Sequence, residues 1–547
     1  MTMGRAERGI PLWAVLLLTF GAVLAAHAPL LHLPYYWDEA GYYVPAAYDF
    51  FRTGTLIPFS TLSNAHPPLP SLYLALWWKL FGFAPVVTRI AMCLIAAAAL
   101  TAVWRIAMAA TGKTPVAAAT VLLTGLYPVF FAQSSLAQAD LFAAAGTLWA
   151  LAFLLEERIW AAMVCFTLAA LSKETAIVTP VALAVWESWQ LRSRPGRIRT
   201  VAALLLPVLP LMAWYAYYRS RTGYIFGNPG YLRYNAISTL TPRRILVAFW
   251  YRMMHVTVHM NLFVPVALMF GCLLLPPVAE AVVGDSSAEP RPRLPIAPAH
   301  QAIFYITIAT NVVLFSVVGG AVLTRYLLPL YPLILLLAVS TFRRRLRDWT
   351  ALVALSAAGF IAGLFINPPY RFAPEDNIEY VTTIRLQQAA IREIVTQFPH
   401  ATVLTAWPAS DELRKPELGY VTHAFPVVTI DNFSAAQIVR AAELPPTWTV
   451  ALVFSTQYDP TGMPFGLDQE GEALDKEYFD LHRDLDPGVI ARVLGGTVVW
   501  KESRKGEWAA VVRVDRVPAA QGSAECPGHA ARVGLTQVSV DRLRPVP

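Results

Sequence analysis

The chain has 547 residues, of which 56% are hydrophobic and only 14% are charged. Soluble globular proteins carry about 25% charged residues, so this composition excludes a wholly soluble protein. The positive charge lies in short segments between apolar runs, as in a membrane protein. We therefore expect membrane lipids, and no nucleic acid, among the partners.

Charge divides the chain into two parts. Residues 1–367 contain 26 Lys and Arg against 13 Asp and Glu, a formal net charge of +13. Residues 368–547 contain 17 against 23, a net charge of −6. We predict a membrane domain over 1–367, a soluble α/β domain over 368–517, and a tail over 518–547 without clear periodicity.

Eleven apolar runs in the first part approach the roughly 20 residues that a transmembrane helix needs. They lie near residues 11–31, 86–110, 115–131, 136–155, 159–172, 175–191, 200–218, 256–276, 301–319, 323–340 and 350–367. The predicted fold class is a polytopic α-helical membrane protein with about eleven transmembrane helices and a C-terminal soluble α/β domain.

Basic residues indicate which side of the membrane is which. In this arrangement one side carries the arginine clusters near residues 5–8, 192–199, 291–293 and 343–347. By the positive-inside rule that side is cytoplasmic. The loops at 32–85 and 219–255 and the C-terminal domain then face outward, with residue 345 inside and residue 450 outside. We expect a multi-pass protein of the cell (inner) membrane whose C-terminal domain is extracytoplasmic or periplasmic.

Two adjacent carboxylates, Asp38 and Glu39, follow the first apolar run within the sequence Tyr-Tyr-Trp-Asp-Glu. Burial among aromatic side chains and repulsion between like charges both raise a carboxyl pKa, which is how a general base is tuned toward neutral pH. The alternative is a solvated helix start beside an interfacial aromatic belt. Local sequence leaves these two interpretations open.

Further charged candidates map to the same face. His66 precedes a Pro-Pro turn in the first loop, where a structural role is the commoner one. Asp140 begins the fourth run, near the interface, where burying a charge costs less than at the bilayer centre. Lys173 and Glu174 share a tight outward turn and form either a local ion pair or part of an anion site.

The outward loop at 219–255 is rich in arginine, and no acidic residue occurs between Glu187 and Glu280. Either the topology differs there, or the arginines bind an anion such as a lipid-linked phosphate or lipid headgroups. The candidates for phosphate binding are Arg243 and Arg244, together with Arg325 and Tyr326 at the start of the tenth run.

These candidates converge on one side of the membrane. They predict an outer-leaflet cavity with carboxylates for proton transfer and cations for a phosphate. Two other classes remain open: a transporter or flippase for a lipid-linked or anionic substrate, and a scaffold whose soluble domain binds a partner. The sequence has no visible internal repeat, and its carboxylates cluster at one face, which disfavours the transporter.

Five features follow one another along the chain: the Asp-Glu pair, the His-Pro-Pro-Leu that starts at His66, the acid that enters the fourth run, the Gly-Asn-Pro at 227–229, and the Arg-Tyr-Leu-Leu-Pro-Leu-Tyr-Pro that starts at Arg325. Together they resemble the GT-C membrane glycosyltransferases, and within them family 39, the protein mannosyltransferase and aminoarabinose transferase group. The resemblance covers about residues 1–367.

This resemblance implies a membrane glycosyltransferase. Such an enzyme transfers a sugar from a polyprenyl-phosphate-linked donor to an acceptor hydroxyl of a lipid, glycan or protein, by single inverting displacement at the outer face. By the same resemblance Asp38 matches the catalytic acid of the first loop, Glu39 its neighbour and Asp140 the second acidic position. Whether a divalent metal joins Asp38 and Asp140 is left open.

The resemblance also suggests which residues lie near the lipid phosphate. His66 falls where the aminoarabinose branch has a lysine before the two prolines, which puts a direct phosphate contact by this residue in doubt. Lys173 and Arg325 match basic positions near the phosphate loosely.

Overall fold

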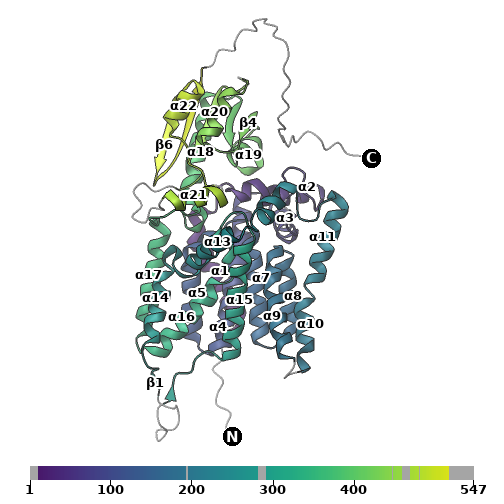
Figure 1. Cartoon of the computed structure of the whole chain (residues 1–547), viewed down its shortest axis with the longest axis vertical. Coiled ribbons are helices and arrows are strands. Elements are labelled where there is room, and N and C mark those ends of the chain that lie inside the picture. The colour runs from purple at the N-terminus through teal and green to yellow at the C-terminus, as the bar shows by residue number, and fades with distance from the viewer. Residues whose placement is uncertain are drawn as a thin grey trace.

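The structure is a computed structural model that describes residues 10–63, 65–191, 195–280, 291–445, 447–458, 469–479 and 481–515. A long bundle of helices forms one part, and an α/β part lies at one end of it (Figure 1). Helices of the first loop lie at that same end, and the short strands near residue 280 lie at the other. The predicted tail at 518–547 lies outside the described residues.

Helices, including those of the first loop and of the arginine-rich segment, make up most of the chain up to residue 365. In chain order these are α1 (Leu12–His27), α2 (Val44–Thr53), α3 (Leu69–Phe81), α4 (Pro85–Thr111), α5 (Thr114–Leu126), α6 (Pro128–Gln133), α7 (Ala139–Leu155), α8 (Ile159–Ala170), α9 (Val178–Gln190), α10 (Ile198–Leu205), α11 (Val208–Thr222), α12 (Pro229–Leu232), α13 (Pro242–Thr257), α14 (Phe263–Leu273), α15 (Pro298–Val317), α16 (Tyr331–Arg345) and α17 (Trp349–Phe365). The two-residue strands β1 (Ala279–Glu280) and β2 (Arg291–Pro292) pair between α14 and α15.

Every predicted apolar run coincides with a helix or a pair of helices, but eleven spans are not confirmed. Within the described residues, four helices are long and apolar enough to cross a membrane: Leu12–Leu30, Pro85–Thr111, Ile198–Thr222 and Pro298–Val317. A bent pair, α13 and α14, brings the number to five. Proline accounts for part of the difference, because Pro128 ends α5 and begins α6 within one predicted run.

The arginine-rich segment at 219–255 differs from its prediction as a loop. Much of it is α13, whose axis makes an angle of 98° with α14. Met260 and Asn261, at the bend, both have positive φ. One side of α13 is buried, and it carries Arg244 and Arg252, eight residues apart. These arginines therefore belong to a packed helix surface.

The C-terminal part contains a five-stranded mixed sheet. Its elements are α18 (Tyr380–Gln397), β3 (Val403–Ala406), α19 (Ala409–Arg414), β4 (Val427–Ile430), α20 (Ala435–Glu443), β5 (Val450–Phe454), α21 (Gln469–Tyr478), α22 (Pro487–Leu494), β6 (Gly496–Arg504) and β7 (Glu507–Val514). The strand order is β4-β3-β5-β7-β6, with β3 parallel to β4 and β5 and the other pairs antiparallel.

The α/β part packs directly on the first loop. The Tyr420 hydroxyl donates a hydrogen bond to the carbonyl of Tyr35 at 3.0 Å, and the rings of Trp37 and Trp407 are 5.2 Å apart at an edge-to-face angle. Gly41 leaves room for Trp407, because a Cβ at this position would overlap the indole ring. The first loop is thus held between the bundle and the α/β part.

Candidate active site

A cavity of about 1710 Å³ lies where the first loop, α13, the 324–326 turn and the C-terminal part meet. Most of its lining is aromatic or aliphatic, with a few charged groups on the walls. The C-terminal part contributes Trp407, residues 456–458 and His482 to this lining. A cavity with these properties suits a ligand with a long apolar portion and a charged or polar head.

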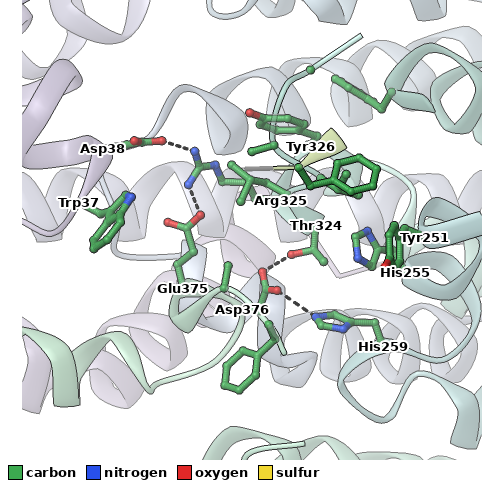
Figure 2. Close-up of a pocket in the computed structure, with 18 of the residues that line it drawn as sticks. Trp37, Asp38, Tyr251, His255, His259, Thr324, Arg325, Tyr326, Glu375 and Asp376 are labelled. Carbon is green, nitrogen blue, oxygen red and sulfur yellow. Dashed lines mark hydrogen bonds and ion pairs between the residues drawn. The ribbon is translucent and has the colours of Figure 1, made fainter. Parts of the chain in front are cut away.

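Arg325 lies at the centre of the charged wall. Its side chain is buried, and its guanidinium forms ion pairs with Asp38 and Glu375, which lie on either side of it (Figure 2). A third carboxylate, Asp140, approaches the Nε of Arg325 at 3.2 Å. The structure thus brings together three of the predicted residues, Asp38, Asp140 and Arg325, from segments far apart in the sequence.

Asp140 also holds Lys173. The Lys173 ammonium donates to Asp140 Oδ1 at 2.6 Å and lies 4.0 Å from the ring centre of Tyr326. Lys173 and Tyr326 line the cavity, whereas Asp140 lies behind them in a buried position. Asp140 therefore positions two cations, Lys173 and Arg325.

Asp38 and Glu39 have different environments although they are adjacent. The Asp38 side chain lines the cavity and is 20% exposed. Glu39 is fully buried against Arg89, with Nη1–Oε1 and Nη2–Oε2 distances of 2.6 and 3.0 Å. The backbone N–H groups of Tyr36 and Ala137 donate to the same carboxylate. Glu39 therefore fixes the first loop to α4 and does not line the cavity.

His66 lines the cavity in a separate cluster. Its Nδ1 lies 2.7 Å from Glu174 Oε2, and its Nε2 lies 3.3 Å from the hydroxyl of Tyr231. Burial would raise the pKa of Glu174, but the contact with His66 brings this pKa below its ordinary value. Lys173 and Glu174 thus have different partners, and the local ion pair considered from the sequence is not the arrangement observed.

The two remaining predicted arginines lie outside the cavity lining. Arg244 is buried on α13 and donates to the backbone carbonyls of Ser316 and Gly320, both at 3.3 Å, and to that of Gly319. Arg243 is exposed at the start of α13. Arg244 has a structural role, since it binds carbonyls in the last turn of α15 and just after it. Neither arginine lines the cavity in which a phosphate would bind.

Sequence reasoning missed Glu375 and Asp376, which form a second pair of adjacent carboxylates. Glu375 is buried, pairs with Arg325 and accepts a hydrogen bond from Gln138 Nε2 at 2.9 Å. Burial raises the pKa of Glu375 to about 7, Arg325 opposes this shift, and the Asp38 charge adds to it. The signal in the sequence was an acidic pair within ten residues after the end of an apolar run, as at the first loop.

Asp376 faces a different part of the wall. Its carboxylate binds the Thr324 hydroxyl and lies 3.0 Å from His259 Nε2 (Figure 2). His259 in turn contacts the Tyr370 hydroxyl through Nδ1 at 3.2 Å. These contacts tie the segment after α17 to the bend between α13 and α14 and to the turn that carries Arg325.

Within the described ranges, no group of three or more His, Cys, Asp or Glu side chains is arranged to hold a metal ion. Asp38 and Asp140, the carboxylates considered for a shared metal, share the guanidinium of Arg325 instead.

Comparison with known proteins identifies relatives in sequence and in structure. Residues 65–214 match the family model described as dolichyl-phosphate-mannose-protein mannosyltransferase. ArnT from Cupriavidus metallidurans bound to undecaprenyl phosphate has a TM-score of 0.53 and 15% identity, over 93% of this chain and 98% of that one. Its apo state has a TM-score of 0.51 and 15% identity, over 91% and 97%. No curated protein matches the chain in sequence.

A third structure, the archaeal oligosaccharyltransferase AglB from Archaeoglobus fulgidus in complex with an inhibitory peptide and a dolichol-phosphate, has a TM-score of 0.40 and 11% identity, over 91% of this chain and 74% of that one. The likeness to ArnT extends over 93% of this chain and so includes both the bundle and the C-terminal part. Together these findings confirm the resemblance inferred from the motifs, and the chain has the fold of the GT-C membrane glycosyltransferases.

Proposed function

We propose that the protein is a glycosyltransferase that moves a sugar from a polyprenyl-phosphate-linked donor to an acceptor hydroxyl of a lipid, glycan or protein. The observation that carries this proposal is the cavity wall where Asp38, Lys173 and Arg325 lie together. A carboxylate for proton transfer and cations for a phosphate thus border one space with a largely apolar lining. That combination fits a lipid phosphate whose sugar is attacked by a hydroxyl group.

Asp38 is the general base in this proposal. Its carboxylate takes the proton of the acceptor hydroxyl as the oxygen attacks the anomeric carbon. The bond between that carbon and the phosphate oxygen breaks, and polyprenyl phosphate leaves with the bonding electrons. One displacement inverts the anomeric configuration and needs no covalent enzyme intermediate. General-base assistance contributes about 10²–10⁴ in rate.

The cations stabilise the leaving phosphate. Lys173 and Arg325 supply N–H donors on the same wall as Asp38, and His66 adds an imidazole on another segment of the cavity. Charge that develops on the phosphate oxygen is best stabilised by donors already held in place. Asp140 provides that positioning through Lys173 and Arg325, and Glu39 fixes the loop that carries Asp38. We assign Asp140 and Glu39 as positioning residues.

Transfer of a radiolabelled sugar in proteoliposomes tests this function. Purified wild-type protein with a polyprenyl-phosphate-linked sugar and a pool of glycan or lipid acceptors should form labelled acceptor and free polyprenyl phosphate together, whereas Asp38→Asn should form neither. Movement of the intact donor between leaflets without release of sugar would instead identify a transporter.

The same proposal places the cavity on the outer face of the cell membrane. Two exposed positions test this, Arg347 after α16 and His423 in the C-terminal part. In a background without native cysteines, His423→Cys should react with a membrane-impermeant thiol reagent added to intact cells, and Arg347→Cys should react only after lysis. The reverse pattern would overturn the orientation.

A further inference from the structure

Two nitrogens of the Arg325 guanidinium already donate to carboxylates, Nη1 to Glu375 and Nη2 to Asp38. Asp140 lies 3.2 Å from Nε without a hydrogen bond to it, and the side chain is only 3% exposed. A guanidinium recognises phosphate by directing N–H groups at the phosphate oxygens. A donor phosphate can therefore take the place of Glu375 at Nη1 only if this carboxylate withdraws or becomes neutral.

The balance of charge leads to the same conclusion. With every group ionised, Asp38, Asp140 and Glu375 outnumber Arg325 and Lys173 by one negative charge. A donor phosphodiester would add another negative charge to a buried wall. Uncompensated buried charge is costly, and ionisable groups respond by taking up or releasing protons. One of the carboxylates is thus expected to take up a proton when the donor binds.

Among the three carboxylates, Glu375 has the least compensation. Asp140 lies between Lys173 and Arg325, at 2.6 and 3.2 Å. Asp38 retains 20% exposure, and its proposed role as base requires the ionised form. Glu375 is 5% exposed in its side chain, and Arg325 is its one cationic partner among the described residues. Its other oxygen accepts from Gln138, an uncharged amide.

We infer that Glu375 is a positioning residue for the donor: the ionised side chain holds Arg325, and its protonation releases the Nη1 of Arg325 to the phosphate. This inference rests on the proposed function. It assigns the segment after α17 a part in the reaction, and it makes the affinity for the donor dependent on pH.

The surroundings of Glu375 support a proton on this residue near neutral pH. Arg325 faces it from the 324–327 turn, Asp38 and Tyr36 face it from the first loop, and Asp376 is its neighbour. Burial raises the pKa of Glu375 to about 7 against the opposing effect of Arg325. Because linkage is reciprocal, a bound anion would favour the protonated form further.

Binding of an unreactive polyprenyl phosphodiester analogue to purified protein measures this effect. A phosphodiester keeps one negative charge between pH 6 and pH 8, unlike a monoester, whose second pKa is about 6. Glu375 is mostly protonated at pH 6 and mostly ionised at pH 8. The Kd of the wild type should therefore rise about tenfold from pH 6 to pH 8. Glu375→Gln should bind tightly at both values.

Asp376→Asn is the matched control, because it changes the adjacent carboxylate, which faces His259 and not Arg325. This variant should keep a rise in Kd from pH 6 to pH 8, with its midpoint displaced to lower pH because the Asp376 charge adds to the raised pKa of Glu375. If the wild type has the same Kd at pH 6 and pH 8, the inference is wrong. It is also wrong if the Kd of folded Glu375→Gln depends on pH as the Kd of the wild type does. If the wild type fails to bind the analogue at any pH and fails to turn over donor, the proposed function is what fails.

Discussion

Two buried charge clusters lie next to each other in this molecule, and they differ in what their charges can reach. The pair of Glu39 and Arg89 is closed, because backbone N–H groups and carbonyls complete the contacts of both side chains. The cluster around Arg325 borders a large cavity, and Asp38 within it retains exposed surface. Adjacent positions in the sequence, 38 and 39, thus belong to clusters with different roles.

The comparison distinguishes buried charges that stabilise the fold from charges that a ligand in the cavity can contact. A closed pair stabilises one arrangement of the first loop, since removing either partner leaves a buried charge uncompensated. An open cluster holds its charged side chains in place at the edge of a cavity. A bound substrate can then contact those side chains. Under the proposed function, the closed pair therefore affects folding, and the open cluster affects turnover and binding.

Asp38→Asn gives the largest expected effect. The amide keeps the shape of the side chain but cannot accept the acceptor's proton, so kcat should fall by about 10²–10⁴. The melting temperature should stay close to that of the wild type. Sugar transfer by purified enzyme and a thermal melt of the same sample measure both quantities. If Asp38→Asn keeps near-wild-type transfer, another residue is the general base, and Asp140 is the next candidate.

Glu39→Gln should show the opposite behaviour. It leaves Arg89 buried beside a neutral group, and loss of one partner of a buried pair costs about 3–5 kcal/mol. We expect a clear loss of thermal stability, with turnover per folded molecule within a few-fold of the wild type.

The double variant Glu39→Leu with Arg89→Met should recover much of the stability lost in Glu39→Gln, because neither charge remains. A stable Glu39→Gln with greatly reduced turnover would contradict the assignment of this pair as structural.

Lys173→Met tests the cations of the open cluster. Loss of a charge-assisted contact of about 1.5–3 kcal/mol should raise the donor KM about tenfold or more. Arg243→Met is the matched control, since Arg243 is exposed and lies outside the cavity lining. Initial rates at varied donor concentration in one lipid composition distinguish the two. Equal donor kinetics in both variants would reject the phosphate role of Lys173.

The smallest expected effect concerns stability away from the cavity. Burial raises the pKa of Glu507, on β7, to about 8, although the Thr383 hydroxyl donates to it. Between the unfolded value of about 4.5 and this folded value, the native state binds more protons, so stability falls as pH rises. Glu507→Gln should therefore melt a few degrees higher than the wild type at pH 8.5 and show little difference at pH 5. An equal shift at both pH values would contradict this explanation.

Much of the architecture could be predicted because apolar periodicity is local. Each apolar run coincides with a helix or a pair of helices. The number of spans could not be confirmed in this way, since prolines and the bend before α14 divide some runs into shorter helices. The α13 helix was missed because its buried side carries Arg244 and Arg252, which an apolar pattern does not detect.

The site was predictable only in part. Asp38, Lys173 and Arg325, which line the cavity, were among the candidates because charged residues beside apolar runs stand out in the sequence. The partner of Glu39 was missed, since Arg89 lies 50 residues away inside a long apolar helix. Glu375 was missed because the charge balance assigned it to the soluble part, whereas its contact with Arg325 depends on how the chain folds back onto the bundle.

A structure of the protein in lipid nanodiscs with bound polyprenyl phosphate would test whether the donor phosphate binds at the open cluster, beside the base. The proposal predicts phosphate density within hydrogen-bonding distance of Lys173 or Arg325, with Asp38 facing the space for the sugar and Glu39 still paired with Arg89. Phosphate density elsewhere, with the open cluster unchanged, would contradict it.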